Sequence, residues 1–210
     1  MIYRVDVEQG TEEWFRARSG IPTASRFSDV MAQGAGKLRR NYLYTLAAER
    51  AFGVRSSISI SNKHMEFGTA CEPKAREMYE FLRDVEVTQT GLFILRDGDC
   101  VAGASPDGMV GDDGLIEIKT KLPHLLMEIH DRDEIPPEYI AQVQGQLWVT
   151  DRKWTDFVAY YPEAPVFIKR VERDEDYIAK MRAEVTRFCL DIDAMCKRFE
   201  EKWQTKRSGA

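Results

Sequence analysis

The sequence predicts an α/β fold in which a central mixed β-sheet is flanked by helices on both faces. Two observations support this prediction. Helix-type segments come before and after a run of strand-type segments between residues 85 and 119, and a further helix separates this run from two more strands near residues 157–161 and 166–171. With 210 residues, 43% of them hydrophobic, the chain can enclose one core as a single domain spanning residues 1–210.

The first two helices are predicted from their caps and breakers. Thr11 precedes two acids and a tryptophan, which is typical of a helix start, and Gly20 supplies the end. A proline follows two residues later, so Thr23 or Ser25 is expected to cap the next helix. Because Arg18 lies close to this second start, its guanidinium group and the exposed amides would suit an anionic phosphate.

The remaining elements follow from periodicity and turn residues. Helices are expected at residues 39–52, 62–83 with a kink or division at Pro73, 137–150, and from 174 onward with a frayed tail from Gln204. Strands are expected at residues 85–95 and 101–119, with turn signals at Gly91, 97–98 and 111–114.

Composition narrows the functional classes. The four cysteines are dispersed without a C-x-x-C pair, which argues against a zinc finger or an iron–sulfur cluster. The net charge of −5 argues against a uniformly basic surface that coats nucleic acid, although six basic residues between Arg16 and Arg40 face one acid, Asp29. The sequence shows no apolar signal core or membrane span, so a cytoplasmic protein that does not contact membranes is expected.

The most informative segment runs from Ser105 to Lys119. In a strand, Glu117 and Lys119 share one face, while the isoleucines beside them project into the core from the other. A hairpin turn at residues 111–114 would bring Asp107 close to Glu117. If that turn pairs Val110 with Leu115, however, Asp107 opposes Ile118 and faces the core side, and a bulge or bend near the following glycine would be needed to correct it.

Two carboxylates at the end of a strand pair can hold a hard divalent cation such as Mg²⁺, which prefers oxygen ligands. A neighbouring lysine can stabilise the negative charge that develops on a phosphate under attack. A bare Glu-x-Lys triplet is more often the salt-bridged face of a surface strand. Here Pro106 before Asp107, the apolar alternation around Glu117 and the glycine-rich hairpin favour the functional interpretation, which is phosphodiester hydrolysis.

The segment resembles the PD-(D/E)xK nuclease core, and the chain is similar to the phage lambda exonuclease (YqaJ-type viral recombinase) family. The resemblance covers most of the chain. Its motifs are residues 14–18 with 21–25, 66–68 with Glu72, 105–108, 115–119, and 139–144 with 147–150.

The resemblance implies a 5′→3′ exonuclease acting on linear double-stranded DNA. It implies dependence on two Mg²⁺ ions, with Mn²⁺ as a substitute, a ring-shaped homotrimer, and transfer of the remaining single strand to a single-strand annealing protein. Carried onto matching positions, it assigns metal binding to Asp107, Glu117 and the Ile118 carbonyl, a supporting role to Glu72, and action on the nucleophile to Lys119.

The resemblance also implies further binding residues. Gln142 matches the active-site glutamine of the family and Tyr139 its neighbouring tyrosine. The 5′-phosphate pocket takes four positions, which are Arg18, Thr23, Ser25 and Ser105. The chain departs from the family pattern after Lys119, because the family has a phosphate-contacting arginine where this sequence offers Lys121 and His124.

Two alternatives remain open at this stage. One is another nuclease on the same scaffold, either an endonuclease or a RecB-like or Cas4-like exonuclease, although the dispersed cysteines weigh against the cluster-bearing kinds. The other is a catalytically inert DNA-end-binding module, which the presence of both acids and the lysine disfavours.

Overall fold

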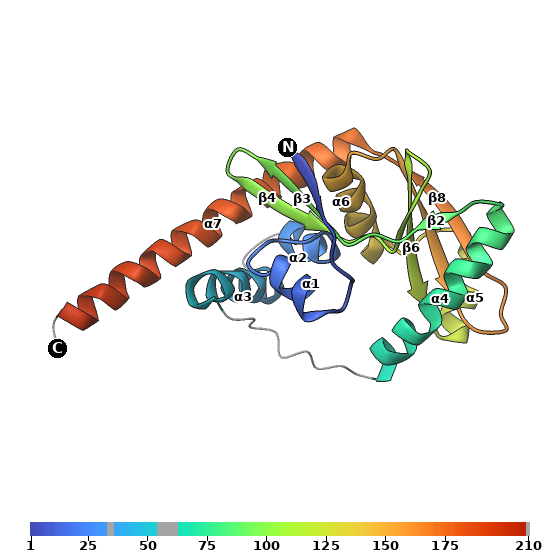
Figure 1. Cartoon of the computed structure of the whole chain (residues 1–210), viewed down its shortest axis with the longest axis horizontal. Coiled ribbons are helices and arrows are strands. Elements are labelled where there is room, and N and C mark those ends of the chain that lie inside the picture. Colours follow the sequence, from blue (N-terminus) through green and yellow to red (C-terminus); the bar gives the residue numbers. More distant parts are fainter. Residues whose placement is uncertain (33–35, 54–62, 209–210) are drawn as a thin grey trace.

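A computed structural model of the chain describes residues 1–32, 36–53 and 63–208 (Figure 1). Its first elements are β1 (Ile2–Val5), α1 (Glu12–Ala17), the short helix η1 (Ala24–Arg26), α2 (Phe27–Met31), α3 (Lys37–Phe52) and α4 (Lys63–Arg83). Five strands follow, β2 (Val87–Thr88), β3 (Leu92–Asp97), β4 (Cys100–Ala104), β5 (Gly108–Val110) and β6 (Gly114–Thr120). The rest comprises α5 (Pro123–Arg132), η2 (Pro137–Tyr139), α6 (Ile140–Thr150), β7 (Trp154–Tyr160), β8 (Phe167–Glu172) and α7 (Glu175–Ser208).

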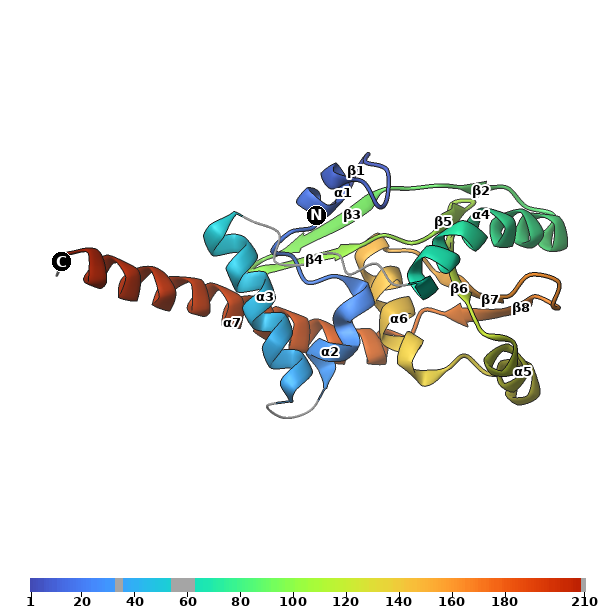
Figure 2. The same cartoon turned by 90° about the horizontal axis from the view of Figure 1, so that it is seen from below.

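The predicted mixed sheet is confirmed as a five-stranded sheet in the order β2-β5-β6-β7-β8. Strands β6 and β7 pair in parallel, and the other neighbouring pairs are antiparallel. Helix α4 covers one face, and α5 and α6 lie on the other (Figure 2). The sheet is therefore buried on both faces, as the sequence predicts.

Side-chain alternation along β6 separates the two faces. Ile116 and Ile118 pack with Tyr79 of α4 in one apolar cluster. Leu115 packs on the opposite face with Leu147 of α6, in a second cluster. Glu117 has the same parity as Leu115, so its side chain points toward α6 rather than α4.

A second sheet is not predicted from the sequence. Strands β1, β3 and β4 form a separate three-stranded antiparallel sheet, so the expected strand at 85–95 divides into two strands that belong to different sheets. The division falls at Gly91, where an added Cβ would lie 2.4 Å from the carbonyl oxygen of Val5. The expected strand at 101–119 also divides, because β4 joins the small sheet while β5 and β6 join the large one.

The helix predictions have mixed outcomes. The Thr11 cap is confirmed, because its side chain accepts a hydrogen bond from the Trp14 amide at 3.3 Å. Gly53 ends α3 in the left-handed conformation, with φ of 62°. The expectation of a side-chain cap at Thr23 is wrong, because its hydroxyl makes no capping bond and instead contacts Arg18. Helix α4 continues through Pro73, so of the two expected alternatives, a kink or a division, the division is absent.

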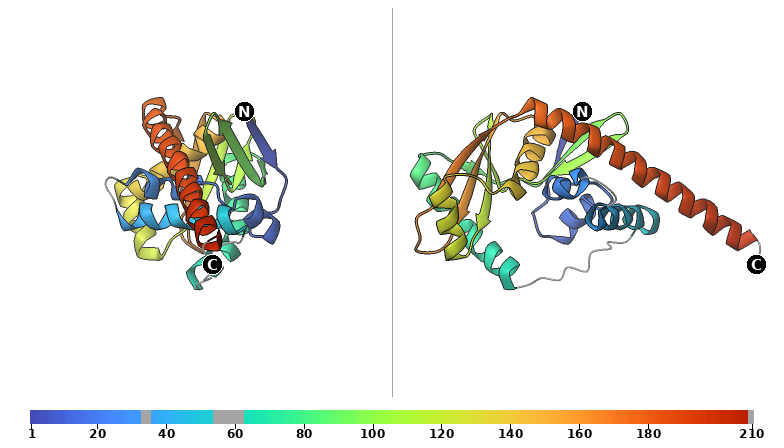
Figure 3. Two further views of the ribbon diagram at one scale, coloured as in Figure 1. Left: turned by 90° about the vertical axis from the view of Figure 1, so that its left-hand side faces the viewer. Right: turned by 180° about the vertical axis from the view of Figure 1, so that it is seen from behind.

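The two ends of the chain differ from expectation. Strand β1 and helix α5 are not predicted from the sequence. Helix α7 continues to Ser208 through the region expected to fray from Gln204, while 209–210 and the expected helix start at Asn62 lie outside the described residues. The last turns of α7 extend past the rest of the described chain (Figure 3). Within the described residues, no helix is long and apolar enough to cross a membrane.

Candidate active site

The hairpin of β5 and β6 brings Asp107 beside Glu117. The expected pairing of Val110 with Leu115 is wrong, because Val110 pairs with Gly114. A shift of one residue changes which face every side chain meets, and extending this register places Asp107 opposite Glu117. The chain also bends at Asp107, so the irregularity expected near this point is present.

The Asp107 carboxylate is held against the neighbouring strand. Its Oδ2 atom accepts a hydrogen bond from the Ile118 amide at 2.6 Å, and the Asp107 amide donates to the Ile116 carbonyl at 3.1 Å. Burial raises the pKa of Asp107 well above its usual range, and the nearby Glu117 carboxylate raises it further. A cation at this point would relieve the repulsion between the two carboxylates.

Glu117 lies at the floor of the site, with only 1% of its surface exposed. Its Oε1 atom forms an ion pair with the Lys119 ammonium at 2.6 Å. Burial alone would lower the pKa of Lys119, but the Glu117 and Asp107 carboxylates outweigh that effect and raise it. Lys119 therefore carries a positive charge at neutral pH beside two carboxylates.

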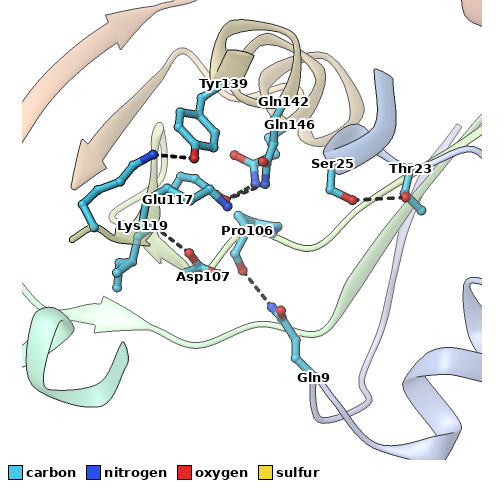
Figure 4. A network of polar contacts seen from close by, with 12 residues as sticks. Gln9, Thr23, Ser25, Pro106, Asp107, Glu117, Lys119, Tyr139, Gln142 and Gln146 are labelled. Atoms are coloured by element: carbon cyan, nitrogen blue, oxygen red, sulfur yellow. Dashed lines mark hydrogen bonds and ion pairs between the residues drawn. The ribbon is translucent and has the colours of Figure 1, made fainter. Parts of the chain in front are cut away.

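Helix α6 supplies amide donors to the same carboxylate. Gln142 and Gln146 lie one turn apart and reach from one helix toward Glu117 (Figure 4). The Gln142 side chain donates to Oε1 of Glu117, and that of Gln146 donates to Oε2, each at 2.5 Å. Tyr139, at the start of this helix, accepts a hydrogen bond from the Lys121 ammonium at 2.6 Å.

Glu72 reaches the site from α4, on the other side of Asp107. Its carboxylate accepts from Arg76 at 2.6 Å, and the same Arg76 nitrogen lies 3.5 Å from the Asp107 carbonyl oxygen. Burial raises the pKa of Glu72, while Arg76 lowers it and Glu117 raises it. Glu72 lines a neighbouring cavity of about 610 Å³ that also includes Asp107.

The residues expected to contact a phosphate gather opposite the carboxylates. The Arg18 guanidinium donates to the Thr23 hydroxyl at 2.9 Å and to the Ser25 hydroxyl at 3.5 Å. It also lies over the Trp14 ring, 4.1 Å from the centroid, and the indole nitrogen of Trp14 donates to the Ser105 hydroxyl at 2.9 Å. One cation and three hydroxyl groups therefore converge, and such groups can bind an anionic oxygen.

Eight predicted site residues line one cavity of about 160 Å³. They are Arg18, Thr23, Ser25, Ser105, Asp107, Glu117, Lys119 and Gln142. Glu72, Tyr139 and His124 are not among the lining residues, and His124 is exposed on α5. The residues expected to hold the cation and those expected to bind the phosphate therefore line the same cavity. His124 does not line it.

Sequence reasoning assigned no role in the site to four residues of this region. Gln9 donates to the carbonyls of Thr90 and Pro106, at 2.9 and 2.8 Å, and so fixes the loop before Asp107. The others are Trp14, Arg76 and Gln146. Only Gln146 had a usable signal, because it follows Gln142 by four residues and must share its helix face.

The donor set suits a hard divalent cation with a partly aqueous shell. Asp107 and Glu117 provide carboxylate oxygens beside the backbone of Ile118, and oxygen is the ligand that Mg²⁺ prefers. Among the described residues, no group of three or more His, Cys, Asp or Glu side chains is arranged to hold a metal ion. Asp107 and Glu117 contribute two carboxylates to this cavity, in keeping with the several waters that Mg²⁺ retains.

Known proteins provide an independent comparison. The crystal structure of an alkaline exonuclease from Laribacter hongkongensis has a TM-score of 0.85 and 40% identity to this chain, covering 93% of this chain and 99% of that one. The same protein in complex with dAMP gives the same TM-score with 41% identity, over the same shares of the two chains.

A curated relative from Acanthamoeba polyphaga mimivirus, described as uncharacterised, is 28% identical over 164 residues. That match covers 72% of this chain and 29% of the relative, so the chain spans less than a third of that protein. Residues 13–153 match the family described as YqaJ-like viral recombinase domain, and they include both carboxylates, Lys119 and Gln142. The expected resemblance is confirmed, and the chain belongs to the YqaJ-like viral recombinase domain family.

Proposed function

We propose that this protein is a Mg²⁺-dependent 5′→3′ exodeoxyribonuclease acting on linear double-stranded DNA. The observation that carries the proposal is the single cavity in which Asp107, Glu117 and Lys119 face the Arg18 guanidinium and its neighbouring hydroxyls. The similarity to the alkaline exonuclease of Laribacter hongkongensis supports a nuclease on this fold.

The chain's own residues can be given roles in this reaction. Asp107 and Glu117 would hold the cation, and Lys119 would stabilise negative charge on the phosphate under attack. Mg²⁺, when bound, polarises a phosphate and lowers the pKa of water. Gln142 donates to the same Oε1 atom that pairs with Lys119, and so would orient the carboxylate that contacts the ammonium.

Arg18 would bind the terminal 5′-phosphate of the strand. With that phosphate fixed, only the first phosphodiester bond beyond it is aligned for attack, and each cleavage exposes a new 5′-phosphate. The products would be 5′-mononucleotides and a 3′ single strand. A ring-shaped homotrimer would retain the duplex, and a single-strand annealing protein would receive the strand that remains. These last two features rest on the family alone.

The decisive experiment compares three DNA substrates with Mg²⁺ and with EDTA. Linear duplexes carry either a 5′-phosphate or a 5′-hydroxyl, and the third substrate is a closed circular duplex. We expect mononucleotides from the linear duplexes, faster release from phosphorylated ends, and an intact circle. Cleavage of the circle would indicate an endonuclease, and binding without cleavage would indicate an inert end-binding module.

The Arg18→Ala variant tests the direction of attack. The lost guanidinium contact exists only with a phosphorylated end, so this variant should slow mainly that substrate and reduce the preference over hydroxyl ends. Ser25→Ala and Ser105→Ala, which remove neutral donors, should show the same selectivity more weakly. Equal slowing by Arg18→Ala on both ends would show that Arg18 does not contact the terminal phosphate.

A further inference from the structure

The two glutamines of α6 contact different oxygens of the same carboxylate. Gln142 donates to Oε1 of Glu117, which also receives the Lys119 ammonium at 2.6 Å. Gln146 donates to Oε2, and among the described residues this is the one hydrogen bond found at that atom. A carboxylate oxygen has two acceptor positions, so Oε1 is fully used and Oε2 has one position left.

Charge favours the same oxygen for a bound cation. The Lys119 ammonium is paired with Oε1, and a divalent cation at that atom would face a like charge at close range. Oε2 carries only the neutral amide of Gln146. A cation at Oε2 would meet the full attraction of the carboxylate with less repulsion from Lys119.

We propose that Gln146 is a positioning residue that fixes Oε2 of Glu117 as the oxygen presented to the divalent cation. This inference rests on the proposed Mg²⁺-dependent function. Gln142 then acts on the other oxygen, which also pairs with Lys119. The two amides would have separable effects, one on cation affinity and one on the rate of the loaded site.

The surroundings of Gln146 argue against a purely structural role. Its side chain is 1% exposed, and its amide oxygen has no hydrogen-bond partner among the described residues. A carboxylate can only accept, so the amide must turn its NH₂ group toward Glu117, and the unpaired oxygen is a consequence of that orientation. A methionine would bury no unpaired acceptor but would leave Oε2 of the buried Glu117 without this donor, so the amide offsets its own unpaired oxygen only through what it does for Glu117.

The test uses Gln146→Met with Gln142→Met as its matched control on the same helix and the same carboxylate. Mn²⁺ binding to the full chain without DNA is measured by titration calorimetry, and cleavage of a 5′-phosphorylated duplex is measured across Mg²⁺ concentrations. Gln146→Met should weaken Mn²⁺ binding by about 10-fold or more, as losses of residues that orient metal ligands do. The cleavage rate of Gln146→Met should fall at low Mg²⁺ concentration and recover in part at high Mg²⁺ concentration. Gln142→Met should weaken Mn²⁺ binding much less than Gln146→Met does, and the cleavage rate that it loses should not recover when Mg²⁺ is added.

Several outcomes would overturn the inference. Wild-type Mn²⁺ affinity in Gln146→Met, or the same pattern in both variants, would show that the two amides are not separable. If Gln146→Met does not fold, Gln146→Leu replaces it, and failure of both to fold would assign Gln146 to the fold. Absence of cleavage by the wild-type protein would contradict the proposed function instead, so the two failures are distinguishable.

Discussion

At the residue scale, burial and crowding set the character of the carboxyl groups. Asp107 and Glu72 both have raised pKa values, first because burial disfavours their charged forms and also because Glu117 lies nearby. Such an arrangement destabilises the protein without a cation and favours binding one. The same crowding therefore links stability, pH and metal binding.

Asp107→Asn should stabilise the metal-free protein while abolishing cleavage. An aspartate in an unfolded chain has a pKa of about 3.9, and the pKa of Asp107 in the folded protein is higher. Between these two pKa values the folded protein therefore binds more protons than the unfolded chain does. The free energy of unfolding then falls as pH rises from the lower pKa to the higher one. Above the higher pKa the protein keeps this loss of stability. The variant removes this cost, and a gain of about 1 kcal/mol would appear as a rise of about 2–4 °C in Tm.

The measurement is thermal unfolding in EDTA from pH 4 to pH 8, followed by repetition with Mg²⁺. The wild-type protein should gain Tm on addition of Mg²⁺, and Asp107→Asn should gain much less. A lower Tm for the variant at pH 8 in EDTA would contradict the assignment of electrostatic crowding at this position.

Lys119→Met should separate charge stabilisation from cation binding. Loss of one donor that stabilises transition-state charge costs about 3–4 kcal/mol, or about 10²–10³-fold in rate. Lys153→Met is a suitable control, because Lys153 is 71% exposed and pairs with Asp113 in the hairpin loop. Single-turnover cleavage at saturating Mg²⁺ should fall only for Lys119→Met, and near-normal turnover by that variant would show that Lys119 is not catalytic.

At the element scale, local signals predict helix caps and strands but not which sheet each strand joins. Thr11 and Gly53 act through contacts within a few residues, so the sequence shows them directly. Gly91 indicates only a turn, whereas the structure uses it to pass the chain close to β1 while moving from one sheet to the other. That approach depends on residues far away in sequence, which no local pattern reveals.

Gly145→Ala should loosen α6 and with it the two glutamines. An added Cβ would lie 2.5 Å from the Phe27 ring, which is fully buried in the core formed by α2, α6 and α7. Overpacking of this kind costs about 1–3 kcal/mol, measurable by urea unfolding, and displacement of α6 should also lower cleavage. Phe27→Leu in the same chain should restore part of both losses. A fully stable and active Gly145→Ala would show that α6 tolerates movement.

Asp156→Ala should destabilise the junction between α4 and the large sheet. Asp156 is fully buried on β7, where it accepts hydrogen bonds from Tyr79 of α4 at 2.8 Å and from Arg170 of β8 at 2.8 and 2.9 Å. Removing one partner of a fully buried ion pair costs about 3–5 kcal/mol, and the loss here should be smaller because the Arg170 side chain is 46% exposed to water. Asp156→Asn keeps an acceptor, so its free energy of unfolding in urea should fall less than that of Asp156→Ala. Equal falls in the two variants would show that the acceptor kept by Asp156→Asn contributes nothing to stability.

At the scale of the whole molecule, the site combines segments that are far apart in sequence. The Trp14 contact with Ser105 spans 91 residues, and the Gln146 contact with Glu117 spans 29. Spacing within one motif predicts that Glu117 and Lys119 share a face, because that depends on a single strand. It cannot predict Gln9, which follows β1 and contacts the Pro106 carbonyl, or Arg76 of α4, which contacts the Asp107 carbonyl.

The charge distribution limits where DNA can bind. The net charge is −5, and six basic residues lie between positions 16 and 40. Two of them form ion pairs with acids, Arg26 with Asp29 and Arg39 with Asp191. Arg18 contacts hydroxyl groups within the cavity. Fewer of these six basic residues are therefore available to bind DNA at the candidate site than the sequence alone suggests.

DNA affinity should depend on salt and on this local charge rather than on net charge. Arg18→Glu and Lys202→Glu change the net charge by the same amount, but Lys202 is exposed near the end of α7, far along the chain from the cavity residues. Binding of a 5′-phosphorylated duplex in Ca²⁺, measured by fluorescence anisotropy at several salt concentrations, should weaken as salt rises, because counterions are released on binding. Arg18→Glu should weaken binding by about 10-fold and reduce the salt slope by about 1, whereas Lys202→Glu should leave both nearly unchanged. Equal effects of the two reversals would show that the protein responds to its overall charge, and salt-independent binding would place the DNA contacts away from phosphate altogether.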